Sequence, residues 1–138
     1  MAGRTIVVVG ASLAGFRAAE ELRARGHDGP IAVVGDEPHR PYDRPPLSKQ
    51  VLAGTQPPEA LALTPAEGSV EDLGLDWHLG TTASALDLAA REVVLGGGDR
   101  LPFDGLVIAT GARAKQLPGT DHLSGVHTLR TVDDCLSL

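Results

Sequence analysis

This sequence of 138 residues has a single cysteine, few aromatic residues and no long hydrophobic segment. The lone Cys135 excludes an internal disulfide and a Cys-x-x-Cys redox pair. Aromatic residues make up only 3% of the chain, so its core must be mainly aliphatic. The apolar run Ile6–Val9 is too short to span a bilayer, and no signal-peptide pattern precedes it. We therefore expect a cytoplasmic protein with no membrane partner.

The charge of the chain and the spacing of its histidines argue against further classes of binding partner, and its size indicates one domain. A net charge of −6 gives no electrostatic reason to expect nucleic acid or an anionic membrane as a partner. The length fits one domain, with enough buried surface for a core. The histidines share no metal-ligand spacing, so no metal site is expected; they are His27, His39, His78, His122 and His127.

The start of the chain has the pattern of a nucleotide-binding turn. The β-branched run Thr5–Val9 changes abruptly to small residues and then to a helical pattern, as in the strand–turn–helix opening of a dinucleotide-binding unit. Gly10 allows a tight turn, and Gly15 lets the helix pack closely on the strand. Ser12 replaces the middle glycine of the usual pattern. The N–H groups between Gly10 and Gly15 would face a pyrophosphate at the positive end of the helix.

An acidic residue follows the next expected strand. A helix over Leu13–Arg25 and a strand over Ile31–Val34 would complete a right-handed β-α-β unit. Asp36 lies just past that strand, 21 residues after Gly15, where a carboxylate accepts hydrogen bonds from a ribose diol. Glu37 is the competing candidate. Both could instead be solvated loop acids.

A proline-rich basic segment comes next, Pro38–Lys49. Its prolines stiffen the backbone and keep much of it out of helix, with a short helix expected over Pro46–Ala53. Such a segment can hold Arg44 and Lys49 at fixed points against a ligand. By composition alone, it could equally be a surface linker.

The rest of the sequence, taken with its start, predicts an α/β fold, a Rossmann-like parallel sheet with an inserted β-meander at about 82–103. Strands are expected over Leu75–Leu79 and Leu106–Ala109, and a helix capped by Thr64 over Pro65–Leu73. The last helix, within Leu129–Leu138, has Thr131 as its cap and Asp134 to complete a capping box.

One family resembles this chain over nearly its whole length. Its most specific segment is Pro41-Tyr42-Asp43-Arg44-Pro45-Pro46-Leu47-Ser48-Lys49, followed by Ala109-Thr110-Gly111. This combination resembles the N-terminal region of FAD-dependent ferredoxin reductases, the family of putidaredoxin reductase, rhodocoxin reductase and dioxygenase reductase components. The resemblance implies an incomplete FAD/NAD(P)-binding domain of the two-dinucleotide flavoprotein type. Residues 1–115 would be its first FAD-binding segment, and 116–138 an exit linker and truncated helix before an NAD-binding domain.

The resemblance also implies which residues bind the adenosine diphosphate part of FAD. Asp36 would hold the ribose, Arg44 would lie near the ribose and phosphates, and the backbone of Ala83 would meet the adenine. The pyrophosphate would be wrapped by the first turn, namely Gly10, Ser12, Leu13, Ala14 and Gly15.

Other residues would contact the rest of the cofactor. Lys49 would lie near the isoalloxazine, where a fixed ammonium favours the electron-rich reduced ring. Ala109, Thr110 and Gly111 would run past the cofactor, and Arg130 would contact it. Similar proteins transfer a hydride from NAD(P)H to FAD and pass single electrons to a ferredoxin that feeds an oxygenase. That chemistry needs no catalytic acid–base pair or nucleophile, and none is assigned.

Family members are considerably longer than this chain. They carry a second glycine-rich motif for NADH and a later Gly-Asp segment that completes the flavin pocket, which residues 1–138 lack. We therefore expect this chain alone to be inactive, to bind FAD weakly or not at all, and to expose sheet edges that allow self-association. Alternatives are a nitrite-reductase subunit, a protein like apoptosis-inducing factor, or a non-enzymatic adenine-nucleotide-binding module.

Overall fold

The computed structural model describes residues 3–138, which form two compact units. The first unit extends up to Pro41 and includes Leu63–Thr110. The second consists of Tyr42–Ala62 and Gly111–Leu138. The chain thus passes from the first unit to the second and back before it enters the second unit again.

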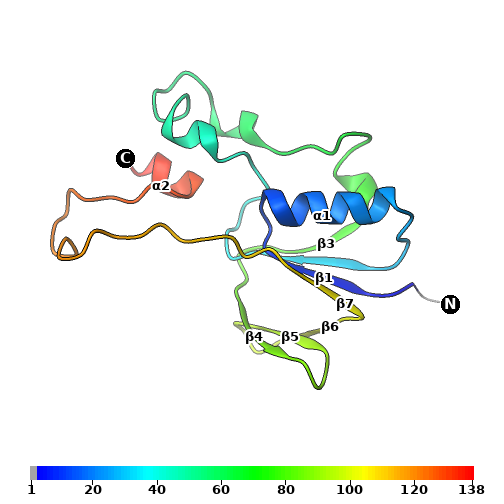
Figure 1. The fold of residues 1–138 in the computed structure, drawn as a ribbon. Coiled ribbons are helices and arrows are strands. Elements are labelled where there is room, and N and C mark those ends of the chain that lie inside the picture. Colours follow the sequence, from blue (N-terminus) through cyan, green and yellow to red (C-terminus); the bar gives the residue numbers. More distant parts are fainter. Residues whose placement is uncertain (1–2) are drawn as a thin grey trace. The chain divides into compact units, whose positions relative to one another are not determined.

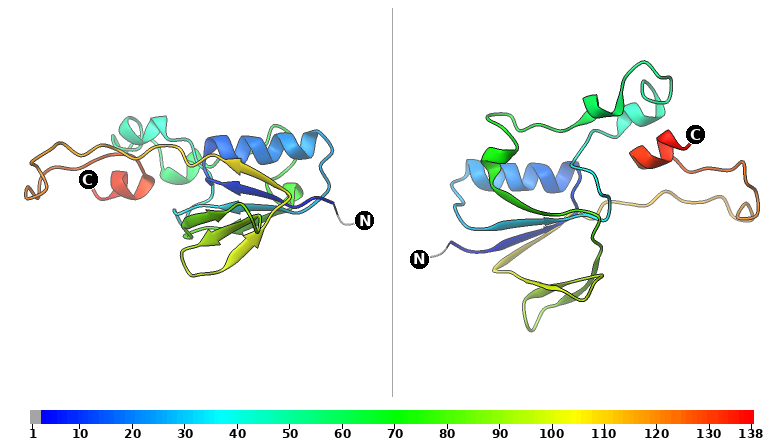
Figure 2. Two further views of the ribbon diagram at one scale, coloured as in Figure 1. Left: turned by 60° about the horizontal axis from the view of Figure 1, so that its bottom comes forward. Right: turned by 180° about the vertical axis from the view of Figure 1, so that it is seen from behind.

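The first unit is built on a parallel sheet with the strand order β3-β2-β1-β7. The strands are β1 (Ile6–Val9), β2 (Ile31–Val34), β3 (Leu75–His78) and β7 (Gly105–Ile108). Helix α1 (Leu13–Ala24) covers one face of this sheet, and a three-stranded antiparallel meander lies against the other face (Figures 1 and 2). The meander strands are β4 (Ala83–Asp87), β5 (Glu92–Leu95) and β6 (Arg100–Pro102).

Alternate residues of the central strands enter two different cores. Towards α1, Val8 and Val33 pack with Ala19 in one buried cluster. Towards the meander, Val7 and Val34 belong to a second cluster, completed by β5 residues. Both faces of β1 and β2 are therefore covered, which is why these strands are apolar at every position rather than at every second one.

Arg23 ties the end of α1 to two strands. Its Nη1 donates to the carbonyl oxygens of His27 and Gly29, each at 2.7 Å, just before β2. Its Nε donates to Leu73 O at 2.7 Å and its Nη2 to Gly74 O at 3.3 Å, just before β3. The planar guanidinium can donate in several directions at once, which an ammonium on a flexible stem does not do as well. Nothing in the local sequence pattern indicated this role.

The second unit is held by a small core of its own. Two 3₁₀ turns, η1 (Pro45–Ser48) and η2 (Pro58–Leu61), pack with helix α2 (Val132–Leu136). The hydroxyl of Tyr42 accepts a hydrogen bond from the N–H of Val132 at 3.0 Å. Cys135 is buried, and its Sγ donates to Leu47 O at 3.1 Å, so the lone cysteine has a packing role.

Most of the expected elements are present, including the four parallel strands, the meander and the capping box at Thr131 and Asp134. The helix expected over Pro65–Leu73 is wrong, because only a 3₁₀ turn, η3 (Glu71–Leu73), forms there. Gly68 has a φ of +73°, which interrupts any helix, and the Asp72 carboxylate accepts hydrogen bonds from Ser69 instead.

The helix expected over Pro46–Ala53 is also shorter than predicted. It is the 3₁₀ turn η1, which ends at Ser48, because Lys49 leaves the helical region with φ −132° and ψ −101°. In residues 3–138, no helix has the length and apolar character needed to cross a membrane. Within the sheet of this described part, β3 and β7 each have one neighbouring strand.

We predict that Arg23→Lys destabilises the fold. Losing most of the carbonyl contacts should lower the free energy of unfolding by about 1–3 kcal/mol, measured by urea denaturation. The control is Arg25→Lys, since Arg25 pairs with Glu21 on the exposed face of α1. That change should alter stability by less than about 0.5 kcal/mol. Equal effects of the two substitutions would refute the role of Arg23.

A second prediction concerns the capping box of α2. The backbone N–H of Thr131, with that of Arg130, lowers the pKa of the Asp134 carboxyl by donating hydrogen bonds to it. Because this pKa is lowered, the cap stabilises α2 fully above the ordinary Asp pKa of about 3.9 and is lost as pH falls through the lowered value. The amide proton shifts of Thr131 and Arg130 should therefore titrate with a midpoint below that ordinary value.

The control is a pair of neutral substitutions on the same helix. Asp134→Asn should abolish this titration, whereas Asp133→Asn, which changes an exposed carboxylate one residue earlier, should leave it. A midpoint at or above the ordinary aspartate value would contradict the capping role.

Candidate functional site

The N-terminus of α1 presents free amide donors. Ser12 is the N-cap, with extended backbone angles, and the N–H of Phe16 makes the first helical bond to Ser12 O at 2.9 Å. The N–H groups of Leu13, Ala14 and Gly15 precede that bond and have no acceptor within the helix. The first turn contains no acidic residue. This end of α1 can therefore bind an anion.

Two glycines bring α1 and the strand ends close together. Gly10 has a φ of +120°, and a Cβ on it would lie 2.0 Å from the carbonyl oxygen of Ala109. A Cβ on Gly15 would lie 1.9 Å from the carbonyl oxygen of Gly10. The tight turn and the close helix–strand packing expected from the sequence are thus both present, and neither position has room for a side chain.

The carboxyl ends of three strands meet beside this turn. The N–H of Gly10 donates to Val34 O at 2.8 Å, and the N–H of Ala109 donates to Val9 O at 2.7 Å. Ala109 and Thr110 therefore follow β7 directly next to Gly10. In open α/β sheets this is the edge where ligands bind, outside the carboxyl ends of the strands.

Asp36 follows β2 at the same edge and is exposed, while Glu37 is half-buried. This difference favours Asp36 as the residue available to a ligand. Gly35, which sequence reasoning missed, brings the loop there, because a Cβ on it would lie 2.5 Å from the Cβ of Ala11. A glycine between a buried strand and an acid is the sequence signal that would have identified it.

Ala83 begins β4, and its side chain packs into the meander-side core. The segment that leads from β3 to Ala83 lies beside the loop of Asp36, because the N–H of Thr81 donates to Gly35 O at 2.8 Å. The first unit thus holds ten of the predicted residues along the strand ends and the segments that follow them, namely Gly10, Ser12, Leu13, Ala14, Gly15, Asp36, Glu37, Ala83, Ala109 and Thr110.

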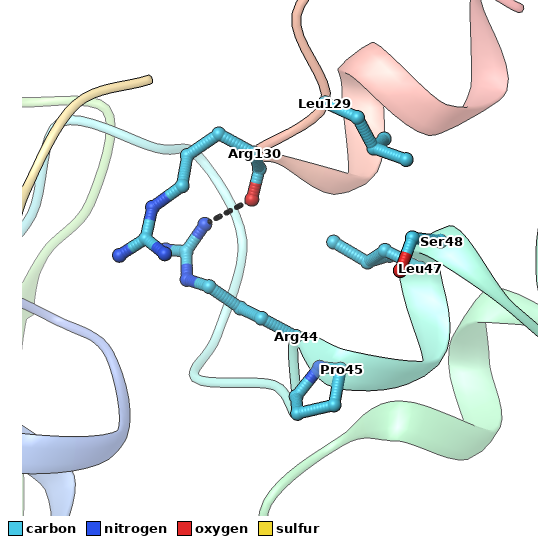
Figure 3. A pocket seen from close by; sticks show the side chains of 6 residues that line it. All are labelled: Arg44, Pro45, Leu47, Ser48, Leu129 and Arg130. Atoms are coloured by element: carbon cyan, nitrogen blue, oxygen red, sulfur yellow. Dashed lines mark hydrogen bonds between the residues drawn. The ribbon is translucent and has the colours of Figure 1, made fainter. Parts of the chain in front are cut away.

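In the second unit, two arginines meet at a pocket of about 340 Å³. Nη1 of Arg44 donates to the carbonyl oxygen of Arg130 at 2.8 Å, and the two guanidinium groups extend to the same side (Figure 3). The Arg44 guanidinium also lies 5.0 Å from the ring centre of Tyr42. The lining consists of Arg44, Pro45, Leu47, Ser48, Leu129 and Arg130. Both of its charged lining residues are arginines, so the pocket is basic.

Gly111 and Lys49 complete the predicted set in this unit. A Cβ on Gly111 would lie 3.6 Å from Nη2 of Arg130, so these two residues are neighbours. Lys49 is exposed after η1, and it is not among the residues that line the pocket. Tyr42, in the motif that carries the family resemblance, is buried and supports Arg44 and α2.

The described residues provide binding groups rather than a metal centre. Among residues 3–138, no three His, Cys, Asp or Glu side chains are grouped so that they could hold a metal ion. The first unit combines amide donors, a carboxylate and close backbone approach. The second unit supplies positive charge. These are groups that recognise phosphate and ribose.

The chain was compared with known proteins. The profile of the pyridine nucleotide-disulphide oxidoreductase family matches residues 4–138. The ferredoxin–NAD(+) reductase component of a biphenyl dioxygenase system from Paraburkholderia xenovorans is 46% identical over 137 residues, which cover 97% of this chain and 33% of that protein. Rhodocoxin reductase from Rhodococcus erythropolis is 42% identical over 135 residues, covering 97% of this chain and 31% of the relative.

Solved structures agree with these sequence matches. The reductase in a covalent putidaredoxin reductase–putidaredoxin complex superimposes with a TM-score of 0.89 at 35% identity, covering 99% of this chain and 33% of that one. The chain therefore spans about a third of the length of the curated relatives that it matches. The expected resemblance and the α/β fold class are confirmed. The chain belongs to the pyridine nucleotide-disulphide oxidoreductase family, and ferredoxin reductases are among its relatives.

Proposed function

We propose that residues 1–138 supply the first part of the FAD-binding region of a ferredoxin reductase. In the complete enzyme, a hydride passes from NAD(P)H to FAD, and electrons then pass singly to a ferredoxin. The observation that carries the proposal is the turn at the start of α1, where Gly10 and Gly15 leave no room for a Cβ and the amide donors remain open. The names of the relatives, ferredoxin–NAD(+) reductase components, supply the reaction class.

The groups of the first unit fit the adenosine diphosphate half of FAD. A pyrophosphate suits the N–H groups of Leu13, Ala14 and Gly15, because the helix end is positive and has no acid in its first turn. The exposed carboxylate of Asp36 suits a ribose diol. The backbones of Ala83, Ala109 and Thr110 are proposed to complete this side. When bound, FAD accepts a hydride and releases electrons one at a time, so the protein binds, orients and supplies charge.

The second unit is proposed to supply the cations. Arg44 is held by Tyr42 and by the carbonyl of Arg130, so its guanidinium is oriented before any ligand binds. Arg44 and Arg130 would contact phosphate or ribose oxygens, with Gly111 beside them. The ammonium of Lys49 is proposed to lie near the isoalloxazine. We further propose 1–115 as the FAD-binding segment and 116–138 as a connection to an NAD-binding domain.

A ferredoxin is the proposed electron acceptor. Two observations support it: the printed names of the relatives, and a solved structure in which a similar reductase is linked to putidaredoxin. We infer a cytoplasmic location, because the proposed electron donor NAD(P)H belongs to that compartment.

The proposal predicts that this chain can replace the corresponding third of a relative. We expect a chimera with these residues in place of the matching segment of the biphenyl dioxygenase system reductase to be yellow, to contain about one FAD per chain and to reduce ferredoxin with NADH. Flavin absorbance and cytochrome-coupled ferredoxin reduction are the measurements. A folded but colourless chimera would overturn the proposal.

In the same chimera, Asp36→Asn should weaken FAD binding about tenfold or more, because a hydrogen bond to a charged acceptor is lost. The matched control is Asp28→Asn, an exposed acid in the loop before β2, at the opposite end of that strand. Apoprotein titrated with FAD, followed by flavin fluorescence, measures both. Equal affinities for the two variants would remove Asp36 from the site.

A further inference from the structure

Arg40 stacks on Trp77, a contact for which the proposed function has no use. The guanidinium carbon of Arg40 lies 4.7 Å from the ring centre of Trp77. Trp77 is half-buried on the edge strand β3 and is the only tryptophan in the chain. Arg40 is exposed at the end of the loop that leaves β2. The side chain therefore connects this loop to the neighbouring strand.

The start of the same loop is bound to the end of β3 and to the segment after it by backbone hydrogen bonds. The N–H of Gly35 donates to His78 O at 3.0 Å, and the N–H of Thr81 donates to Gly35 O at 2.8 Å. The N–H of Gly80 donates to Glu37 O at 2.9 Å. Asp36 lies between these attachment points and is itself exposed. Its carboxylate is therefore only as fixed as the loop.

Prolines couple the position of Arg40 to the conformation of the rest of the loop. Pro38 and Pro41 fix their own φ angles and restrict the residues before them. Backbone of this kind transmits the position of one end to the other, because few dihedral angles are free to absorb a displacement. If the Arg40 end is released, the contact with Trp77 no longer restrains the proline-stiffened part of the loop, and the backbone bonds at Gly35 and Glu37 must hold its start without that support.

We propose that Arg40 is a positioning residue, whose stack on Trp77 holds the loop that presents Asp36 to the ribose of a bound adenine nucleotide. This inference rests on the proposed function, since Asp36 is the ribose acceptor there. A cation–π stack at an exposed site changes the population of the loop conformation that it stabilises by a factor of about two to five. Arginine suits the position because its planar group stacks flat on an aromatic face.

The test is discrimination between ribose and deoxyribose. The apoprotein of the chimera described above is titrated with AMP and with 2′-deoxy-AMP, and the ratio of the two affinities measures the contact with the ribose diol. In Arg40→Met this ratio should fall by a factor of about two to five. In Arg40→Lys, which keeps the cation, the ratio should fall less. The control Arg25→Met removes an exposed arginine of α1 that pairs with Glu21, and should leave the ratio unchanged.

Two readouts that need no ligand are made on the 138-residue chain itself. Trp77 emission should change in Arg40→Met and not in Arg25→Met, because Trp77 is the only tryptophan. Amide hydrogen exchange at Gly80 and Thr81, whose acceptors lie in the loop, should accelerate in Arg40→Met. Exchange at Val8 and Val33, whose side chains are fully buried, should stay unchanged.

The outcomes separate this inference from the proposed function. If the unmodified chimera prefers AMP and the ratio is unchanged in Arg40→Met, the stack only covers the sheet edge, and the inference is overturned. If the unmodified chimera binds AMP and 2′-deoxy-AMP with equal affinity, Asp36 is not a ribose acceptor, and the function proposed for this loop fails. A reduced ratio with faster exchange at Gly80 and Thr81 supports the inference.

Discussion

The close packing of the first turn of α1 on the turn after β1 is the constraint on which this structure depends. A Cβ at Gly15 would lie 1.9 Å from Gly10 O, and one at Gly10 would lie 2.0 Å from Ala109 O. Any side chain at these positions would push α1 off the sheet or β7 away from β1. The same approach leaves the amide donors of α1 open at the carboxyl edge of the sheet. Packing and anion binding therefore require the same two glycines.

The basic segment is ordered by a different set of contacts. Arg44 donates to the hydroxyl of Tyr42 and to the carbonyl of Arg130, and Tyr42 in turn accepts from the N–H of Val132. Asp134 accepts from the N–H groups that precede α2. Two segments nearly ninety residues apart thus form one unit. Its cations are oriented by backbone carbonyl and hydroxyl groups, which cost less desolvation than a buried ion pair.

Much of the fold and part of the site could be predicted, because their causes are local. Continuous apolar runs predicted β1 and β2, and the spacing of Thr131 and Asp134 predicted the cap of α2. The expected helix over Pro65–Leu73 failed for a local reason, the positive φ of Gly68, and the segment before that glycine is bonded to α1. Side chains of α1 take its first backbone groups, with Arg17 donating to Thr64 O and Glu20 accepting from the N–H of Ala66. Gly68, at positive φ, then turns the chain away.

By itself, the sequence determined the strand–turn–helix start, the acid after β2 and the basic proline segment, because each depends on residues that are close in the chain. Only the tertiary structure decided what Arg23, Tyr42 and Arg40 do. Their partners lie up to 51 residues away for Arg23 and 90 for Tyr42. No periodicity or spacing records such contacts, since the sheet and the small second core bring the partners together only once the chain has folded.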